Sequence, residues 1–261
     1  MWTIISASVA GTSHARLGTP CQDAHATLSL DGWALAAVAD GLGSAPCSRD
    51  GAATAVDTAI AFLRTAIETA TPAVLDLEAM LARVGEAFRA AREELVSLAE
   101  ASGEPLAHYG TTLIVVALAA GGVAIGHLGD GAVVAAHADG SIETLSTPHS
   151  GEFLNEVLPL TAPTALAELR LTARAASFHR VALLSDGLQQ LALRLPSGEP
   201  FVPFFAPLFA AVGPALDPAS GSAQLAAFLD SERVCERTED DKTLVVIGAC
   251  AAVPPLAGNS P

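Results

Sequence analysis

The hydrophobic positions of the chain follow two periods, and the change between them predicts the order of strands and helices. Apolar, β-branched runs predict strands over residues 2–8, 24–30 and 33–39. The last two are joined by Asp31-Gly32, a dipeptide favoured in hairpin turns. A polar segment with glycine and proline, residues 11–22, separates the first two strands and is interpreted as a loop.

Farther along, the apolar positions recur every three or four residues, which is the period of a helix with one buried face. Two long helices are predicted, the second of them after Pro72, and we expect both to pack against a sheet or against each other. Their apolar stripes are Ala52, Val56, Ile60, Leu63 and Ile67 in the first helix, and Leu77, Met80, Leu81, Val84, Phe88, Leu95 and Leu98 in the second.

Strand patterns return in the second half of the chain. The predicted elements are strands near 111–118, 123–128, 132–136, 141–145, 169–173 and 181–185, a short helix beyond 186, two helical pieces within 203–229, and a last strand over 243–249. Strands, then two helices, then more strands indicate a layered α+β fold rather than alternating βαβ units. With no repeat and no clear linker, we predict one domain over residues 1–251 and a disordered tail over 252–261.

The segment 110–129 contains no Asp, Glu, Lys or Arg, and its length would suffice for a membrane-spanning helix. It is rich in β-branched residues, however, and Gly121-Gly122 interrupts it. Two buried strands joined by a two-residue Gly-Gly turn explain this pattern better.

Composition narrows the function further. Acidic residues outnumber basic ones by 28 to 13, which argues against a nucleic-acid-binding surface and against binding to an anionic membrane. The chain starts without a signal-peptide pattern, and its four cysteines lack zinc-site spacing. We therefore expect a cytoplasmic protein with reduced thiols.

Candidate chemistry comes from acidic residues at strand ends, most of them beside glycine. They are Asp23, Asp40-Gly41, Gly129-Asp130-Gly131, Asp186-Gly187 and Asp240-Asp241. Each site alone is better explained as a turn, because Asp-Gly is a common turn dipeptide. Five such sites together favour one carboxylate cluster whose repulsion is offset by cations. Oxygen ligands suit Mg²⁺ or Mn²⁺, whereas zinc would require His or Cys.

The order and context of these motifs resemble the metal-dependent protein phosphatases of type 2C, in particular their compact bacterial branch. The matching segments are Ser13-His14, Gly18-Thr19-Pro20-Cys21-Gln22-Asp23-Ala24, Val38-Ala39-Asp40-Gly41-Leu42-Gly43, Tyr109-Gly110-Thr111-Thr112-Leu113, Gly126-His127-Leu128-Gly129-Asp130, Gly151-Glu152-Phe153-Leu154-Asn155-Glu156, Leu184-Ser185-Asp186-Gly187-Leu188 and Asp240-Asp241-Lys242-Thr243. They occur in family order along nearly the whole chain.

The resemblance implies a four-layer α-β-β-α sandwich and hydrolysis of phosphoserine and phosphothreonine in proteins. It implies that Asp40 bridges two Mn²⁺ or Mg²⁺ ions. The Gly41 carbonyl and Asp23, the latter largely through water, would complete one site. Asp186 and Asp241 would hold the other ion, and Asp130 with Asp186 a third, weaker one. Asp40 and Asp186 are then the central catalytic carboxylates. Two close cations activate a bridging water and hold the phosphate, so that no nucleophilic Ser or Cys is needed.

The chain departs from the family pattern at the phosphate clamp. Gly18 stands where many members have an arginine, so His14 and Arg16 are the nearest candidates, and His14 is preferred because it belongs to the branch's Ser-His pattern. Gln22 replaces a glutamate of the better-known relatives. His127, inside an apolar strand, is interpreted as a core histidine, and residues 148–162 as a small or mobile flap.

Three hypotheses about function follow. The leading one is a monomeric phosphatase that acts on phosphorylated Ser/Thr proteins and opposes a cognate bacterial kinase. The alternative is a pseudophosphatase that binds phosphoproteins as a signalling scaffold, since the arginine is missing. A third is a metal-dependent phosphatase with a small-molecule substrate.

Overall fold

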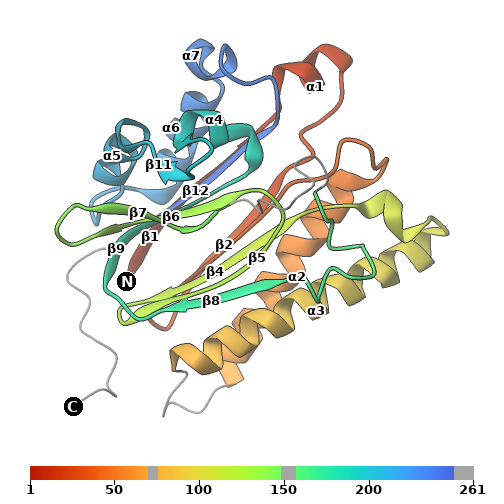
Figure 1. Ribbon diagram of the computed structural model, residues 1–261, viewed down its shortest axis with the longest axis horizontal. Coiled ribbons are helices and arrows are strands. Elements are labelled where there is room, and N and C mark those ends of the chain that lie inside the picture. Colours follow the sequence, from red (N-terminus) through yellow and green to blue (C-terminus); the bar gives the residue numbers. More distant parts are fainter. Residues whose placement is uncertain (70–75, 148–156, 250–261) are drawn as a thin grey trace.

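Two antiparallel sheets lie face to face between two layers of helices in the computed structural model, which describes residues 1–69, 76–147 and 157–249 (Figure 1). The first sheet has the order β1 (Trp2–Val9), β12 (Lys242–Ala249), β9 (Phe178–Leu184), β6 (Ala132–His137) and β7 (Ile142–Ser146). The second has the order β2 (Ala24–Leu30), β3 (Trp33–Ala39), β4 (Leu113–Ala119), β5 (Gly122–Leu128) and β8 (Arg170–Arg174). The predicted α-β-β-α sandwich is confirmed.

The two predicted long helices, α2 (Ser48–Thr69) and α3 (Leu77–Ser102), cover the outer face of the second sheet (Figure 1). Their apolar stripes pack on the outward-facing residues of β3 and β4 in one core cluster. Gly126 in β5 lets α3 approach closely, because a Cβ there would lie 2.5 Å from the Phe88 ring.

The outer face of the first sheet is covered by α4 (Gln189–Ala192), α5 (Val202–Ala211), α6 (Pro218–Leu229) and α7 (Glu232–Cys235) (Figure 1). The break between α5 and α6 falls in the predicted Pro214–Pro218 region. Between the sheets, residues such as Val38, Ile114 and Val245 form a third apolar cluster.

The first predicted hairpin agrees with the structure residue for residue: β2 and β3 are joined at Asp31-Gly32, where both residues have positive φ. The apolar segment 110–129 contains the β4–β5 hairpin, as expected, but its two-residue turn is Ala120-Gly121, one position earlier than predicted. In the described part of the chain, no helix combines the length and hydropathy that a membrane crossing requires.

Part of the predicted loop 11–22 is a short helix, α1 (Thr12–Leu17), which corrects the sequence interpretation. None of its residues is buried, so it has no apolar stripe that a pattern could detect, and it ends at Gly18 with φ of 68°. The short hairpin of β10 (Leu193–Arg194) and β11 (Glu199–Pro200) and the 3₁₀ helix η1 (Leu106–Tyr109) were also not predicted. Residues 148–156 of the predicted flap and the tail 252–261 lie outside the described residues.

Candidate metal centre

A cavity of about 230 Å³ lies beside the C-terminal ends of β3 and β9. The connection between β5 and β6 and the segment that precedes β12 also line it. Five of the described residues in its wall are aspartates. The lining residues are His14, Gln22, Asp40, Gly41, Leu42, Gly43, Thr112, Asp130, Val157, Asp186, Asp240 and Asp241.

Three carboxylates meet in this cavity from distant segments. Asp40 follows β3, Asp130 follows β5, and Asp186 follows β9 and opens the 3₁₀ helix η2 (Asp186–Leu188). Each offers one oxygen atom, and the three oxygens lie within 4.8 Å of one another. This spacing allows the three oxygens to bind one cation.

The Gly-Thr-Thr segment at the start of β4 fixes the backbone of Asp40. The Asp40 N–H donates to the Thr112 hydroxyl (2.9 Å), and the Thr112 N–H donates back to the Asp40 carbonyl (2.8 Å). The Thr111 hydroxyl donates to the same carbonyl at 3.0 Å. Asp40 is therefore held from the neighbouring strand as well as from its own.

Two glycines of the motifs are required by close approach. A Cβ at Gly41 would lie 2.7 Å from the Gln22 carbonyl oxygen and 2.8 Å from that of Ser48. At Gly129 φ is 121°, in a region that favours glycine, and a Cβ would lie 2.5 Å from the Thr112 side chain. The Asp-Gly and Gly-Asp pairs thus bring three chain segments together at the cavity.

The electrostatics of the cluster favour a cation. Burial, together with the charges of Asp23 and Asp186, raises the pKa of Asp40 well above its ordinary value. Burial and the charge of Asp186 raise the pKa of Asp130 to about 6. A bound divalent cation would offset this repulsion and keep the carboxylates ionised.

Asp23 lies behind the wall of this cavity. It is buried, and its Oδ2 accepts a hydrogen bond from the Ser185 hydroxyl at 2.7 Å. The Ser185 oxygen in turn accepts from the Thr243 N–H at 3.0 Å. Burial raises the pKa of Asp23 to about 7. Through these contacts, Asp23 connects the segment that carries Asp186 with the segment that carries Asp241.

Asp241 lines the cavity, but its carboxylate already has three donors. Oδ1 accepts from the Gly11 N–H (2.6 Å) and from the Nδ1 of His14 (2.9 Å), and Oδ2 accepts from the Gln22 N–H (2.6 Å). The neighbouring Asp240 uses one oxygen, Oδ1, to accept from the Asp241 N–H at 2.8 Å. Asp240 also lines the cavity, where burial and the charge of Asp186 raise the pKa of its carboxyl group.

Only one of the two candidate phosphate-binding residues, His14 and Arg16, lines the cavity. His14 lines the cavity, whereas Arg16 is exposed and forms an ion pair with Glu239 at 2.7 Å. His127 is fully buried, with Nδ1 2.6 Å from the Ser146 hydroxyl and 3.0 Å from Arg170, as expected for a core histidine.

Sequence reasoning did not assign a ligand role to Gln22 or Asp240. The Oε1 of Gln22 and the Oδ1 of Asp130 are buried and have no hydrogen-bond partner within the described residues. Buried oxygens without a donor are costly unless a cation or water binds them, so the donor set fits a hard divalent cation. A signal for Gln22 was present, because it stands where relatives have a glutamate. For Asp240 the only signal was its adjacency to Asp241.

Comparison with known proteins agrees with this geometry. The family model of protein phosphatase 2C matches residues 10–230. The chain is 33% identical over 252 residues to Serine/threonine-protein phosphatase 3 of Escherichia coli (strain K12), covering 94% of this chain and 97% of that protein. Serine/threonine phosphatase Stp1 from Staphylococcus aureus has a similar fold, with a TM-score of 0.67 at 14% identity over 96% of both chains. PppA, described as a regulatory component of the type VI secretion system in Pseudomonas aeruginosa, has a TM-score of 0.62 at 20% identity, over 95% of this chain and 97% of that one.

The chain therefore belongs to the protein phosphatase 2C family. It is a metal-dependent Ser/Thr protein phosphatase, a hydrolase whose substrates are proteins phosphorylated on serine or threonine. This confirms the phosphatase activity of the leading hypothesis, and no finding favours the pseudophosphatase alternative.

Proposed function

We propose that hydrolysis depends on two Mn²⁺ or Mg²⁺ ions with Asp40 and Asp186 as their central ligands, and that a third, weaker ion binds at Asp130. The observation that carries this proposal is the convergence of Asp40, Asp130 and Asp186 within 4.8 Å, beside the unpartnered Gln22 Oε1. Among the described residues, the wall supplies mainly carboxylate and amide oxygens, no cysteine, and one histidine, His14, which is paired with Asp241; this donor set favours Mg²⁺ or Mn²⁺ over zinc.

We further propose a ligand set that differs from the sequence-based one at two positions. Asp240, instead of Asp241, would bind the metal ion beside Asp186. Only one oxygen of the Asp240 carboxylate accepts the hydrogen bond from the Asp241 N–H, so the other oxygen can bind the ion. Gln22, largely through water, would take the place of Asp23 beside Gly41. Asp23 and Asp241 then act as positioning residues that tie α1, η2 and β12 together.

When bound, the cations lower the pKa of water and neutralise phosphate oxygens. The residues of the chain fit direct attack by water. Of the described residues that line the cavity, none is Ser or Cys, and the hydroxyl of the one threonine, Thr112, already accepts a hydrogen bond from Asp40. Leu42 and Val157 contribute apolar side chains to the lining of the cavity.

His14 is the proposed phosphate-binding residue in place of an arginine. No Arg or Lys occurs among the described residues that line the cavity. Because Nδ1 of His14 pairs with Asp241, its Nε2 is the ring nitrogen available to a phosphate oxygen. A single imidazole binds phosphate more weakly than a bidentate arginine, so we expect weak binding of short phosphopeptides.

The proposed setting is a monomer in a bacterial cytoplasm that opposes a cognate Ser/Thr kinase. The free thiols of Cys21, Cys47 and Cys235 in the described segments support a reducing compartment. The substrate class supports a kinase partner, since each phosphoprotein substrate requires one.

The test is hydrolysis of a phosphothreonine peptide with Mn²⁺, with Mg²⁺ and with chelator. We expect activity with either metal, none with chelator, and a loss of at least about 100-fold in Asp40→Asn and Asp186→Asn. Asp57→Asn, on the exposed face of α2, is the matched control and should keep full activity.

Activity that survives chelation would contradict the metal mechanism. Binding of the phosphopeptide without turnover at every metal concentration would favour the pseudophosphatase instead. Faster hydrolysis of nucleotides or sugar phosphates than of phosphopeptides would indicate a small-molecule substrate.

A further inference from the structure

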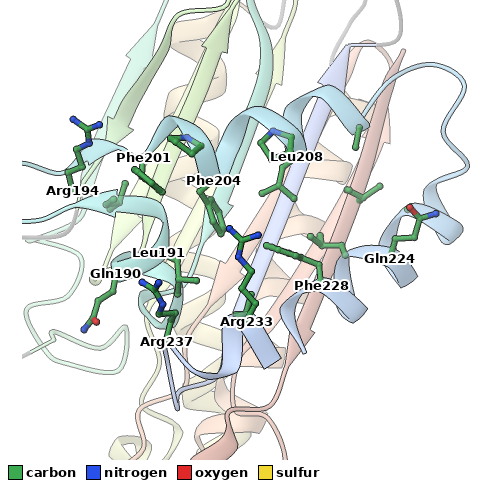
Figure 2. A pocket seen from close by; sticks show the side chains of 18 of the residues that line it. Gln190, Leu191, Arg194, Phe201, Phe204, Leu208, Gln224, Phe228, Arg233 and Arg237 are labelled. Atoms are coloured by element: carbon green, nitrogen blue, oxygen red, sulfur yellow. The ribbon is translucent and has the colours of Figure 1, made fainter. Parts of the chain in front are cut away.

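A second cavity, of about 610 Å³, lies on the outer face of the first sheet, among α4, α5, α6 and α7 (Figure 2). It is larger than the cavity of the metal centre, and the two cavities share no described lining residue. Most of the wall is apolar and aromatic, including Leu191, Phe204, Leu208, Leu225 and Phe228. Protein interiors leave few voids larger than a water molecule, whereas ligand sites have volumes of roughly 300–1,000 Å³.

The charges around this cavity have one sign. Arg194, Arg233 and Arg237 line it, and neither Asp nor Glu occurs among the described residues of its lining. Within the described part of the chain, none of the three guanidinium groups has a carboxylate partner within 4 Å. The whole sequence has only 13 basic residues against 28 acidic ones, so a cavity lined by three arginines differs in charge from most of the chain.

Figure 2 shows how the arginines relate to the apolar wall. The side chain of Arg233 points between Phe204 and Phe228, and Arg237 lies beside Leu191. Since Arg233 lines the same cavity as these rings, its guanidinium hydrogen-bond donors are available to an anion at the apolar wall. The cavity thus combines space for an apolar body with donors for an anionic head.

We propose that this cavity binds a single-chain amphiphile with an anionic head, such as a long-chain carboxylate or a lysolipid phosphate. The apolar chain would lie along Phe204, Leu208 and Phe228, with the head against Arg233 and Arg237. An acidic protein segment with apolar side chains is the competing occupant. The cavity favours the smaller ligand because helices surround it on several sides and its volume lies within the range of small-molecule sites.

The cavity is connected to the metal centre by short segments. Gln190 and Leu191 line it from α4, which follows Asp186 directly after η2. Gln189, also in α4, donates its side-chain N–H to the Asp130 carbonyl. On the other side, Arg237 precedes Asp240 by three residues. A ligand that shifts α4 therefore shifts groups at the metal centre, and we infer that it changes phosphatase activity. This regulatory part rests on the proposed function.

Calorimetric titration of the metal-free full chain with decanesulfonate, below its micelle concentration, tests the binding site. The sulfonate head stays charged at any working pH and binds Mn²⁺ weakly. We expect saturable binding of one molecule per chain, at least about 10-fold weaker for decanol, and none for decyltrimethylammonium. Arg233→Gln should weaken decanesulfonate binding about 10-fold, whereas Arg89→Gln, exposed on α3 outside the cavity, should leave it unchanged. Ala211→Trp, which narrows the cavity without changing its charge, should also weaken it.

Several results would overturn the proposal. They are the absence of saturable binding, equal affinity for decanol and decanesulfonate, and an Arg233→Gln variant that binds like the wild type. Binding of a short Leu/Glu peptide without binding of decanesulfonate would assign the cavity to a protein partner instead.

Regulation is measured separately, as the Mn²⁺ concentration for half-maximal activity with and without saturating decanesulfonate. A change of at least about twofold in the wild type, absent in Arg233→Gln, is expected. An unchanged value in an active, ligand-bound enzyme would refute regulation. Because calorimetry needs no turnover, failure of the proposed function and failure of this site are distinguishable.

Discussion

Replacing Asp240 or Asp241 by asparagine separates a metal ligand from a positioning residue at adjacent positions. In Asp241→Asn, the amide oxygen can keep the bonds from Gly11 and His14, but the amide nitrogen then faces the Gln22 N–H. In Asp240→Asn, the amide oxygen can keep the bond from the Asp241 N–H, and a negative charge is removed from a cluster of like charges.

The magnitudes follow from these contacts. The Asp241 change loses one charge-assisted bond and leaves a buried donor unpaired, which costs about 2–3 kcal/mol. For a chain of this size that cost corresponds to a fall in melting temperature of about 4–12 °C. The Asp240 change should alter the free energy of unfolding of the metal-free protein by less than about 0.5 kcal/mol. It should raise the half-saturating Mn²⁺ concentration by at least about 10-fold, because even second-shell partners of metals have effects of that size.

Melting in chelator and Mn²⁺ titration of phosphopeptide hydrolysis, both on the same two variants, provide the assay. The expected pattern is crossed: Asp241→Asn loses stability without metal, and Asp240→Asn loses metal affinity without losing stability. The reverse pattern, with Asp241→Asn as stable as the wild type and defective in Mn²⁺ binding, would refute our assignment and restore the ligand set predicted from sequence.

Three further predictions concern the surroundings of the centre. In chelator, the melting temperature should fall as pH rises from about 4 to about 7. The pKa is about 6 at Asp130 and about 7 at Asp23 in the folded protein, against 3.8 when unfolded. The folded state therefore binds more protons than the unfolded state over that pH range, and its stability is lost as those protons leave. Added Mn²⁺ should abolish the fall, and a flat profile in chelator would contradict the burial argument. Gly41→Ala should destabilise the protein by about 1–3 kcal/mol in urea unfolding, because the added Cβ would contact two carbonyl oxygens. Gly43→Ala is the control and should not destabilise the protein, because no atom lies within contact distance of a Cβ there. Equal effects of the two substitutions would count against the close approach at Gly41. Ser185→Ala should cost about 2–3 kcal/mol in the same assay, since Asp23 loses one of its hydroxyl partners and the Thr243 N–H loses its acceptor. A neutral result would mean that water replaces the hydroxyl.

Elements with a long periodic signal could be predicted from sequence. The β2–β3 hairpin is defined by a turn dipeptide between two apolar runs, and α2 and α3 by stripes several turns long. Helix α1 could not be predicted in this way, because it buries no residue and is held by contacts from far along the chain, such as Ser13 to the Glu239 carbonyl. The predicted β4–β5 turn was wrong by one residue. Gly121 can form a two-residue turn with either Ala120 or Gly122, and only the pairing of Ala119 with Gly122 distinguishes the two turns.

The same limit explains why the candidate site was only partly predicted. Asp40, Asp130 and Asp186 each stand alone beside a glycine at a strand end, so motif order is enough to bring them together. Asp240 and Asp241 are adjacent just before β12, and the chain bends at Asp240, so that the two side chains have different partners. One of them must face the donors of Gly11 and Gln22, and the other must face Asp186. Which one does so depends on the register between β12 and β1, in which Lys242 pairs with Val9. A shift of that pairing by one residue would exchange the two roles without changing a single motif.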